Sequence, residues 1–178
     1  MKKSIAIDMD GVLADVEAHF ISWYEKEYGE RFSKDDLKGK TEENAFPKKG
    51  MVKKFASTKG FFSTVPVMDG AVEAIKELQK NYEVYIVSAA MEFPQSLVEK
   101  RSWLSEHFPF IHWKNIIFCG DKSVIGTDIM IDDHLKNLDY FKGETIMFTA
   151  FHNIDFDNHT RANNWREVLK ILKSLEKF

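Results

Sequence analysis

The sequence is poor in three features that would each point to a particular environment or partner. Its single cysteine, Cys119, excludes an internal disulfide and suits a reducing compartment. No apolar run approaches the length of a membrane span, and Asp8 and Asp10 interrupt the apolar core that a signal peptide would need. Lysine and arginine total 25 against 28 acidic residues, a net charge of −3 that does not favour a polyanionic partner. We therefore expect a cytoplasmic protein that binds neither membranes nor nucleic acid polymers.

Hydrophobic residues, by contrast, are plentiful. They make up 44% of the 178 residues, and 15 residues are phenylalanine, which is enough to bury a substantial core. The length suits one domain of ordinary size, or one core that carries a modest insertion. No internal repeat or low-complexity segment interrupts the chain.

Apolar segments of two kinds alternate along the chain. Five short, uncharged runs are typical of buried strands, over residues 4–8, 82–87, 116–119, 128–131 and 145–148. Apolar residues at helical spacing predict helices over residues 15–28, in a segment that Asp69 is expected to cap, and over 94–107, 135–141 and 165–175. Residues 150–162 are expected to form a polar loop. The alternation predicts an α/β fold, with a Rossmann-like, five-stranded parallel sheet and helices on both faces.

The segment that follows the first strand and helix differs in composition from the rest of the chain. Residues 34–59 contain eight lysines against four acidic residues, a local excess of four positive charges. We expect residues 16–66 to form a small helical cap, with short helices near 33–38 and 49–57. The core would then comprise residues 1–15 and 67–178. Most of these lysines are expected to be solvated, and together they would attract an anionic substrate. The cap is expected to hinge near Val16 and Val65–Pro66.

Polar side chains of distinct kinds follow four of the predicted strands, at the point where each strand ends. Asp8 and Asp10 follow the first strand, Ser88 the second, Lys122 the third, and the acidic pair 132–133 the fourth. Singly, each has an ordinary structural explanation, such as a turn or a helix cap. In a parallel sheet, however, all four ends meet at one edge. Two carboxylates, a hydroxyl, an ammonium group and an acidic pair suit phosphoryl transfer with Mg²⁺, which prefers oxygen ligands.

These motifs resemble those of the haloacid dehalogenase superfamily of phosphatases, as Asp8-Met-Asp-Gly, Ser88, Lys122 and Asp132-Asp133. Longer segments resemble the 5'(3')-deoxyribonucleotidase family over nearly the whole chain. These segments are Asp-Met-Asp-Gly-Val-Leu-Ala-Asp at 8–15, Gly-Phe-Phe at 60–62, Gly-Ala-Val-Glu-Ala at 70–74, Asp-Lys-Ser-Val at 121–124, and Phe-Thr-Ala followed by His-Asn within 148–153.

The resemblance implies roles for the residues that make and break bonds. Asp8 would attack phosphorus and form an aspartyl-phosphate. Asp10 would protonate the leaving alkoxide and then deprotonate the hydrolytic water. Mg²⁺ would be held by Asp8, the backbone carbonyl of Asp10, and Asp132, while Asp133 would orient a bound water or Lys122 from behind. Lys122 would neutralise the charge of the phosphate.

The resemblance also implies contacts to the substrate, a small phosphate ester of the nucleoside monophosphate type. Ser88 and nearby backbone N–H groups, including that of Ala89, would hold phosphate oxygens. Lys100 corresponds to a family lysine near the phosphate, although its place in a predicted helix also fits a surface lysine. Phe61 and Phe62 could stack a base, or could simply pack where the cap returns to the core.

Three positions depart from the family pattern. Val16 stands where better-known members have an aromatic residue, Ala89 where they have a second hydroxyl, and Gly120 where they have an arginine. The base preference therefore stays open, and so does another small phosphate ester, such as a sugar phosphate or a modified nucleotide. A non-catalytic module that binds phosphate is a third, weaker alternative. The chain could be a monomer or a homodimer.

Several other residues near these motifs receive structural interpretations. His134 is expected to begin a helix, and His152 and Asn153 to cap a loop. Trp103 and Trp113 are expected to lie in the core.

Overall fold

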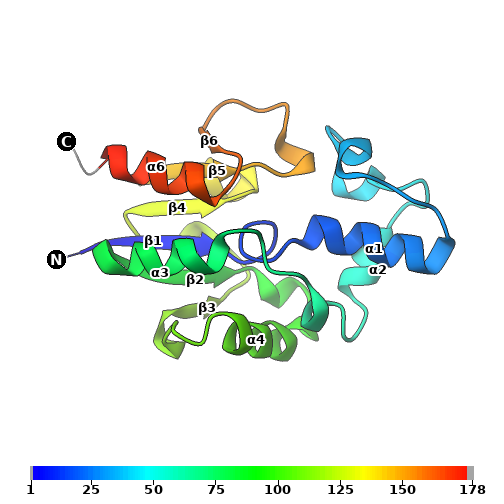
Figure 1. The fold of residues 1–178 in the computed structure, drawn as a ribbon, viewed down its shortest axis with the longest axis horizontal. Coiled ribbons are helices and arrows are strands. Elements are labelled where there is room, and N and C mark those ends of the chain that lie inside the picture. The colour runs from blue at the N-terminus through cyan, green and yellow to red at the C-terminus, as the bar shows by residue number, and fades with distance from the viewer. Residues whose placement is uncertain (1, 176–178) are drawn as a thin grey trace.

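A single sheet of parallel strands forms the centre of the protein. The computed structural model describes residues 2–175 and places β1 between β2 and β4, in the order β3-β2-β1-β4-β5-β6 (Figure 1). The strands are β1 (Lys3–Asp8), β2 (Tyr82–Ser88), β3 (Ile116–Phe118), β4 (Ile129–Asp132), β5 (Glu144–Phe148) and β6 (Thr160–Ala162). Every neighbouring pair is parallel. The predicted Rossmann-like α/β class is therefore confirmed.

The number of strands is a correction, because the sheet has six strands and not five. The sixth, β6, lies within residues 150–162, which the sequence predicted to be a polar loop. It is only three residues long and pairs with β5 from Ile146–Thr160 to Phe148–Ala162. Such a short edge segment, with one buried residue, carries too little apolar pattern to be recognised as a strand.

Helices cover the two faces of the sheet unequally. The α-helices of the described residues are α1 (Val16–Tyr28), α2 (Met51–Ala56), α3 (Ala71–Asn81), α4 (Ser96–His107), α5 (Leu135–Leu138) and α6 (Trp165–Leu175). Buried residues of α3, α4 and α6 join the larger apolar cluster with Ile5 and Ile7 of β1. Ala6 faces the other way, into a smaller cluster that includes Leu138 of α5. Alternating residues of the central strand thus serve two cores.

Residues 16–66 lie beyond the carboxyl ends of the strands, where α1 and α2 extend away from the sheet (Figure 1). The helix predicted over 33–38 is a 3₁₀ turn at Lys34–Leu37, and that predicted over 49–57 is α2. Aromatic rings fill the inside of this segment. Phe61 contacts His19, Phe20 and Trp23 at ring-centroid distances of 4.7, 4.8 and 5.1 Å. This segment is therefore folded around aromatic packing of its own, continuous with the larger core.

Two local predictions were wrong. α3 begins after Gly70, whose φ of 74° is left-handed, so Asp69 is not the capping residue. Trp113 is 63% exposed, whereas Trp103 is buried as predicted. The surroundings of Trp113 explain the difference, since it lies in a 3₁₀ turn before the edge strand β3. Within residues 2–175, no helix is long and apolar enough to cross a bilayer.

Candidate active site

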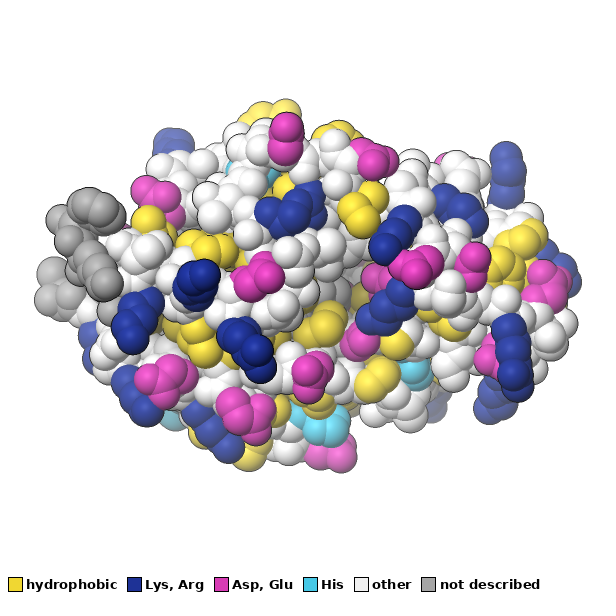
Figure 2. Space-filling model, turned by 45° about the horizontal axis from the view of Figure 1, so that its top comes forward, with side chains coloured by type: hydrophobic (Ala, Val, Ile, Leu, Met, Phe, Trp, Pro, Cys, Tyr) yellow, Lys and Arg dark blue, Asp and Glu magenta, His cyan; other side chains and the backbone are white. Residues whose placement is uncertain are grey.

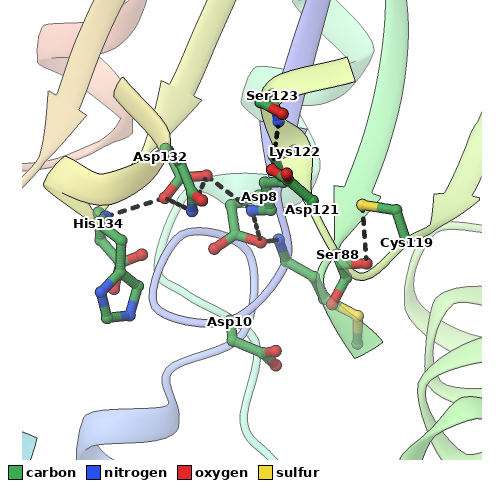
Figure 3. A network of polar contacts seen from close by, with 12 residues as sticks. Asp8, Asp10, Ser88, Cys119, Asp121, Lys122, Ser123, Asp132 and His134 are labelled. Carbon is green, nitrogen blue, oxygen red and sulfur yellow. Dashed lines mark hydrogen bonds and ion pairs between the residues drawn. The ribbon is translucent and has the colours of Figure 1, made fainter. Parts of the chain in front are cut away.

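The carboxyl edge of the sheet brings together the polar residues that follow β1, β3 and β4. The ammonium group of Lys122 lies 2.6 Å from Oδ1 of Asp8 and 2.7 Å from Oδ2 of Asp132 (Figure 3). All three side chains are buried. They come from positions up to 124 residues apart. The parallel sheet places the ends of β1 and β4 side by side, and the turn after β3 carries Lys122 to them.

The electrostatics of this group follow from burial. Burial raises the pKa of the Asp8 carboxyl well above its ordinary value; Lys122 opposes that shift, and Asp132 adds to it. Burial alone would lower the pKa of Lys122, but the charges of Asp8 and Asp132 outweigh it and raise the pKa. Lys122 is therefore held as a cation between two carboxyl groups, where it can compensate negative charge.

Asp133 lies beside this group and is held from the opposite side. Its Oδ2 is 3.1 Å from Nε2 of His152, and its backbone carbonyl accepts a hydrogen bond from the Asn153 amide. Burial would raise the pKa of Asp133, but His134, His152 and Lys122 together hold it well below its ordinary value. Asp133 is thus a buried, ionised carboxylate whose direct partner is His152, while Lys122 pairs with other residues.

A glycine makes room for this carboxylate. Gly11 has a φ of 77°, and a Cβ at that position would lie 2.4 Å from Oδ2 of Asp133. Both the left-handed backbone and the missing side chain are therefore required in the loop after β1. The same loop turns the chain so that Asp8 and Asp10 reach the same edge.

Lys100 forms the second cationic centre. It is buried on α4, forms an ion pair with Asp10, and donates a hydrogen bond of 3.1 Å to Oγ of Ser88. The alternative of a surface lysine is therefore excluded. Oδ1 of Asp10 is buried and, within residues 2–175, has no hydrogen-bond partner. One oxygen of Asp10 is thus held by Lys100, and the other is left for a further group.

These residues open onto a cavity of about 520 Å³ between the sheet edge and residues 16–66. This volume is within the usual range for small-molecule sites. Asp8, Asp10, Lys100 and Lys122 line one end. The apolar part of the wall is formed by Val16, Phe20, Val52, Ala56, Phe62, Ala89 and Phe93.

The two phenylalanines that could either stack a base or pack are placed differently. Phe62 lines the cavity, and the Lys100 ammonium lies 4.3 Å from the centre of its ring. Phe61 is fully buried against the rings of α1. Phe62 therefore has a surface to offer to a ligand, whereas the ring of Phe61 is covered by packing.

Many lysines of the inserted segment are neutralised locally. Lys34 pairs with Asp15 at 2.8 Å, Lys38 with Asp35 at 2.5 Å, and Lys54 with Glu27. On the face drawn in Figure 2, basic and acidic side chains are interspersed. From residues 34–59, Lys53 lines the cavity, and so do Glu42 and Glu43. The excess of four charges is therefore spread over ion pairs and solvent, and it does not make this part of the cavity wall positive.

The donor groups fit a divalent cation. Carboxylate oxygens of Asp8, Asp132 and Asp133 lie within 4.8 Å of one another. Buried Oδ1 of Asp133 has no hydrogen-bond partner among the described residues. Together with Asp10 they make four carboxyl groups beside two lysines, Lys100 and Lys122, so four ionised carboxylates would exceed the charge of the lysines by two. Hard oxygen donors with that charge deficit suit Mg²⁺.

The sequence left two contacts of this site unrecognised. His152 and Asn153 were interpreted as loop caps; Asn153 does accept the N–H of Ala150 in the loop, but both residues also hold Asp133. They follow β5, so the strand-end rule that located the other residues could have located them as well. His134 does begin α5, as expected, and its backbone N–H donates to Oδ1 of Asp132.

The fold is that of haloacid dehalogenase-like hydrolases. A haloacid dehalogenase-like hydrolase from Streptococcus pneumoniae superposes with a TM-score of 0.61 at 14% identity, covering 96% of this chain and 98% of the other. The magnesium-bound YfnB protein from Bacillus subtilis gives a TM-score of 0.57 at 15% identity, covering 97% and 99%. At such identities the likeness concerns the fold.

Sequence comparison identifies the family. Residues 2–177 match the model of the "5' nucleotidase, deoxy (Pyrimidine), cytosolic type C protein" family, and the chain belongs to that family. The 5'(3')-deoxyribonucleotidases of Bacillus subtilis and of Bacillus phage SPbeta are each 40% identical over 174 residues, covering 94% of this chain and 97% of theirs. The protein is therefore an enzyme of the 5'-nucleotidase type, a phosphoric monoester hydrolase.

Proposed function

We propose that the protein hydrolyses deoxyribonucleoside monophosphates with Mg²⁺, through an aspartyl-phosphate on Asp8. The observation that supports this most directly is the buried group of Asp8, Lys122 and Asp132 at the end of a cavity of nucleotide size. The names of the relatives, 5'(3')-deoxyribonucleotidases, support the substrate class.

In the first step, an oxygen of Asp8 attacks phosphorus and the bond to the ester oxygen breaks. Asp10 gives the departing alkoxide a proton, so that the nucleoside leaves neutral. Lys100 now holds Asp10 and Ser88, and it is placed to turn its charge to the phosphate when the substrate enters. In the second step, Asp10 takes a proton from water, which attacks the acyl-phosphate, releases inorganic phosphate and restores Asp8.

The residues that would hold Mg²⁺ are Asp8, Asp132 and the backbone carbonyl of Asp10. When bound, the ion would neutralise charge on the phosphate oxygens. Asp133, fixed by His152 and Asn153, would keep this side of the site negative and in place. Lys122 balances Asp8 and Asp132 throughout, which keeps two carboxylates compatible with burial.

We propose that residues 16–66 act as a cap that closes over the substrate. Val16, Phe20, Val52 and Phe62 from this segment face Asp8 and Asp10 across the cavity. Closure would remove water from the reacting groups. Hydrogen exchange with and without a substrate analogue tests this: we expect slower exchange in residues 16–66 on binding. Equal exchange in both states would contradict a closing cap.

A second candidate is the same reaction on another small phosphate ester. Val16 and Ala89 line the cavity with small side chains, where the family pattern has larger or more polar ones. These positions leave room for a ligand of different shape.

One assay separates these possibilities. Phosphate release is measured over a panel of deoxyribonucleotides, ribonucleotides and sugar phosphates with Mg²⁺, with a chelator, and with Asp8→Asn as control. We expect preference for deoxyribonucleotides and loss of turnover on chelation. Preference for sugar phosphates would favour the second candidate, and binding without phosphate release would point to a non-catalytic module.

A further inference from the structure

One face of α4 is tied to the returning end of the inserted segment by side chains spaced four residues apart. The Gln95 amide, at the start of the helix, donates to the carbonyl of Ala56 at 2.8 Å. The indole N–H of Trp103 donates to the carbonyl of Val65 at 2.7 Å. Residues four apart share one face of a helix, so these ties lie in a row.

Glu99 is the central member of this row and accepts two hydrogen bonds. Its Oε1 accepts the backbone N–H of Gly60 at 2.6 Å, and its Oε2 accepts that of Phe62 at 3.1 Å. A carboxylate that takes two backbone N–H groups forms stronger bonds than a neutral acceptor would. Gly60 has a φ of 91°, so the chain turns sharply where Glu99 holds it.

The next residue on α4 is Lys100, which belongs to the other end of the cavity. Lys100 binds Asp10 and Ser88, and its ammonium lies 4.3 Å from the centre of the Phe62 ring. Two consecutive residues of α4 thus contact the two ends of the cavity. Lys100 contacts Asp10 and Ser88, and Glu99 holds the backbone that carries the ring of Phe62.

We propose that Glu99 is a positioning residue that sets the distance between the phosphate-binding groups and the ring of Phe62. This inference rests on the proposed nucleotidase function. The phosphate would be held by groups at the sheet edge together with Lys100 of α4, whereas the nucleoside would meet a segment that Glu99 fixes to α4. Reaction rates respond to small displacements of bound groups, so the attachment matters although Glu99 touches no reacting atom.

Loss of the Glu99 attachment should mainly affect ligands that extend from the phosphate-binding groups to Phe62. Inorganic phosphate occupies the phosphate end alone, whereas a deoxyribonucleoside monophosphate spans both ends. Loss of the Glu99 attachment should therefore weaken nucleotide binding more than phosphate binding. Glutamine retains a single acceptor oxygen and would pair with one of the two N–H groups, so its effect should lie between those of glutamate and alanine.

The experiment compares Glu99→Gln and Glu99→Ala with Glu106→Gln, which changes an exposed glutamate on the same helix. For each enzyme, kcat and KM are measured with a pyrimidine deoxyribonucleoside monophosphate, and the inhibition constant with inorganic phosphate. We expect Glu99→Ala to raise KM on the order of tenfold, more than it lowers kcat or weakens phosphate inhibition. Glu99→Gln should fall in between, and Glu106→Gln should match the parent.

A readout independent of turnover accompanies the kinetics. Amide exchange at Gly60 and Phe62 should become faster in both Glu99 variants and stay unchanged in Glu106→Gln. Equal losses of nucleotide and phosphate affinity, or parental KM values in Glu99→Ala, would overturn the positioning role. A parent that hydrolyses only other esters would refute the proposed function instead, while the exchange data would still show whether Glu99 holds the segment.

Discussion

The strand-end site and the inserted segment 16–66 face each other across one cavity, yet they are built by opposite means. At the strand ends, buried charges are held by opposite charges, as in Asp8, Lys122 and Asp132. In the inserted segment, the interior consists of aromatic rings around Phe61, and its charges pair near the surface. Under the proposed function, the chemistry would take place at the sheet edge, and the packed segment would determine how the substrate fits.

This division has an energetic side. Buried charges are tolerated only while each partner is present, because an isolated buried charge is costly. Aromatic packing instead contributes through area and shape, and loses stability in proportion to the cavity that a deletion leaves. Variants at the strand ends should therefore lose stability when a charged partner is removed, whereas variants of the inserted segment should lose stability when buried ring volume is removed.

The largest expected effect is on turnover, from Asp8→Asn. The amide cannot act as the nucleophile, so phosphate release should fall by about 10⁴-fold or more, while the fold is retained because the side chain keeps its size. Phosphate release and circular dichroism check the two parts. Substantial hydrolysis by this variant would show that Asp8, at the end of β1, is not the nucleophile.

Lys122→Met should affect stability as well as turnover. Removing the ammonium leaves Asp8 and Asp132 buried without their common partner, which costs about 3–5 kcal/mol of unfolding free energy. Denaturant unfolding in the presence of a chelator measures it, with the exposed Lys142→Met as control. If both variants unfolded alike, the ion pairs of the site would not be structural.

Phe61→Ala tests the aromatic side. Phe61 is fully buried among three rings, so its truncation should cost about 3–5 kcal/mol of unfolding free energy. Phe156→Ala, at a ring that is 45% exposed, is the matched control, with an expected change of at most about 0.5 kcal/mol. A small loss for Phe61→Ala would mean that the segment is not held by this cluster.

The smallest effect concerns pH. Burial lowers the pKa of His19 below its ordinary value of 6.5, although the hydrogen bond to the Phe61 carbonyl opposes that shift. As the pH falls through 6.5, the unfolded chain takes up a proton that folded His19 does not, so stability declines with acidification. Thermal unfolding from pH 7.5 to 5.5 should show a shallower decline in His19→Gln. An unchanged pH dependence of thermal stability in His19→Gln would show that His19 does not contribute to the loss of stability on acidification.

Much of the site could be predicted because its residues follow a rule of topology. Asp8, Ser88, Lys122 and Asp132 each stand at or just past the end of an apolar run, and parallel strands align such ends. The same rule could have placed His152, but its strand was followed by what looked like an ordinary polar loop. β6 was missed because three edge residues carry almost no pattern.

Contacts made between elements could not be predicted in this way. Lys100 reads equally well as a surface lysine, because helical spacing does not say which polar residue of α4 turns inward. Glu99 presents the same difficulty, since its partners are backbone groups nearly forty residues away. Phe61 and Phe62 are adjacent in sequence, yet one is covered by rings and the other lines the cavity.

The amino-acid pattern by itself determined the α/β class and the edge of the sheet where Asp8, Lys122 and Asp132 meet, because strand period and parallel order follow from local hydrophobicity and chain connection. Only the tertiary structure decided which side chains are paired, which ring faces the cavity and which helix holds it. Those outcomes depend on packing between segments that are distant in sequence, and no local pattern encodes them.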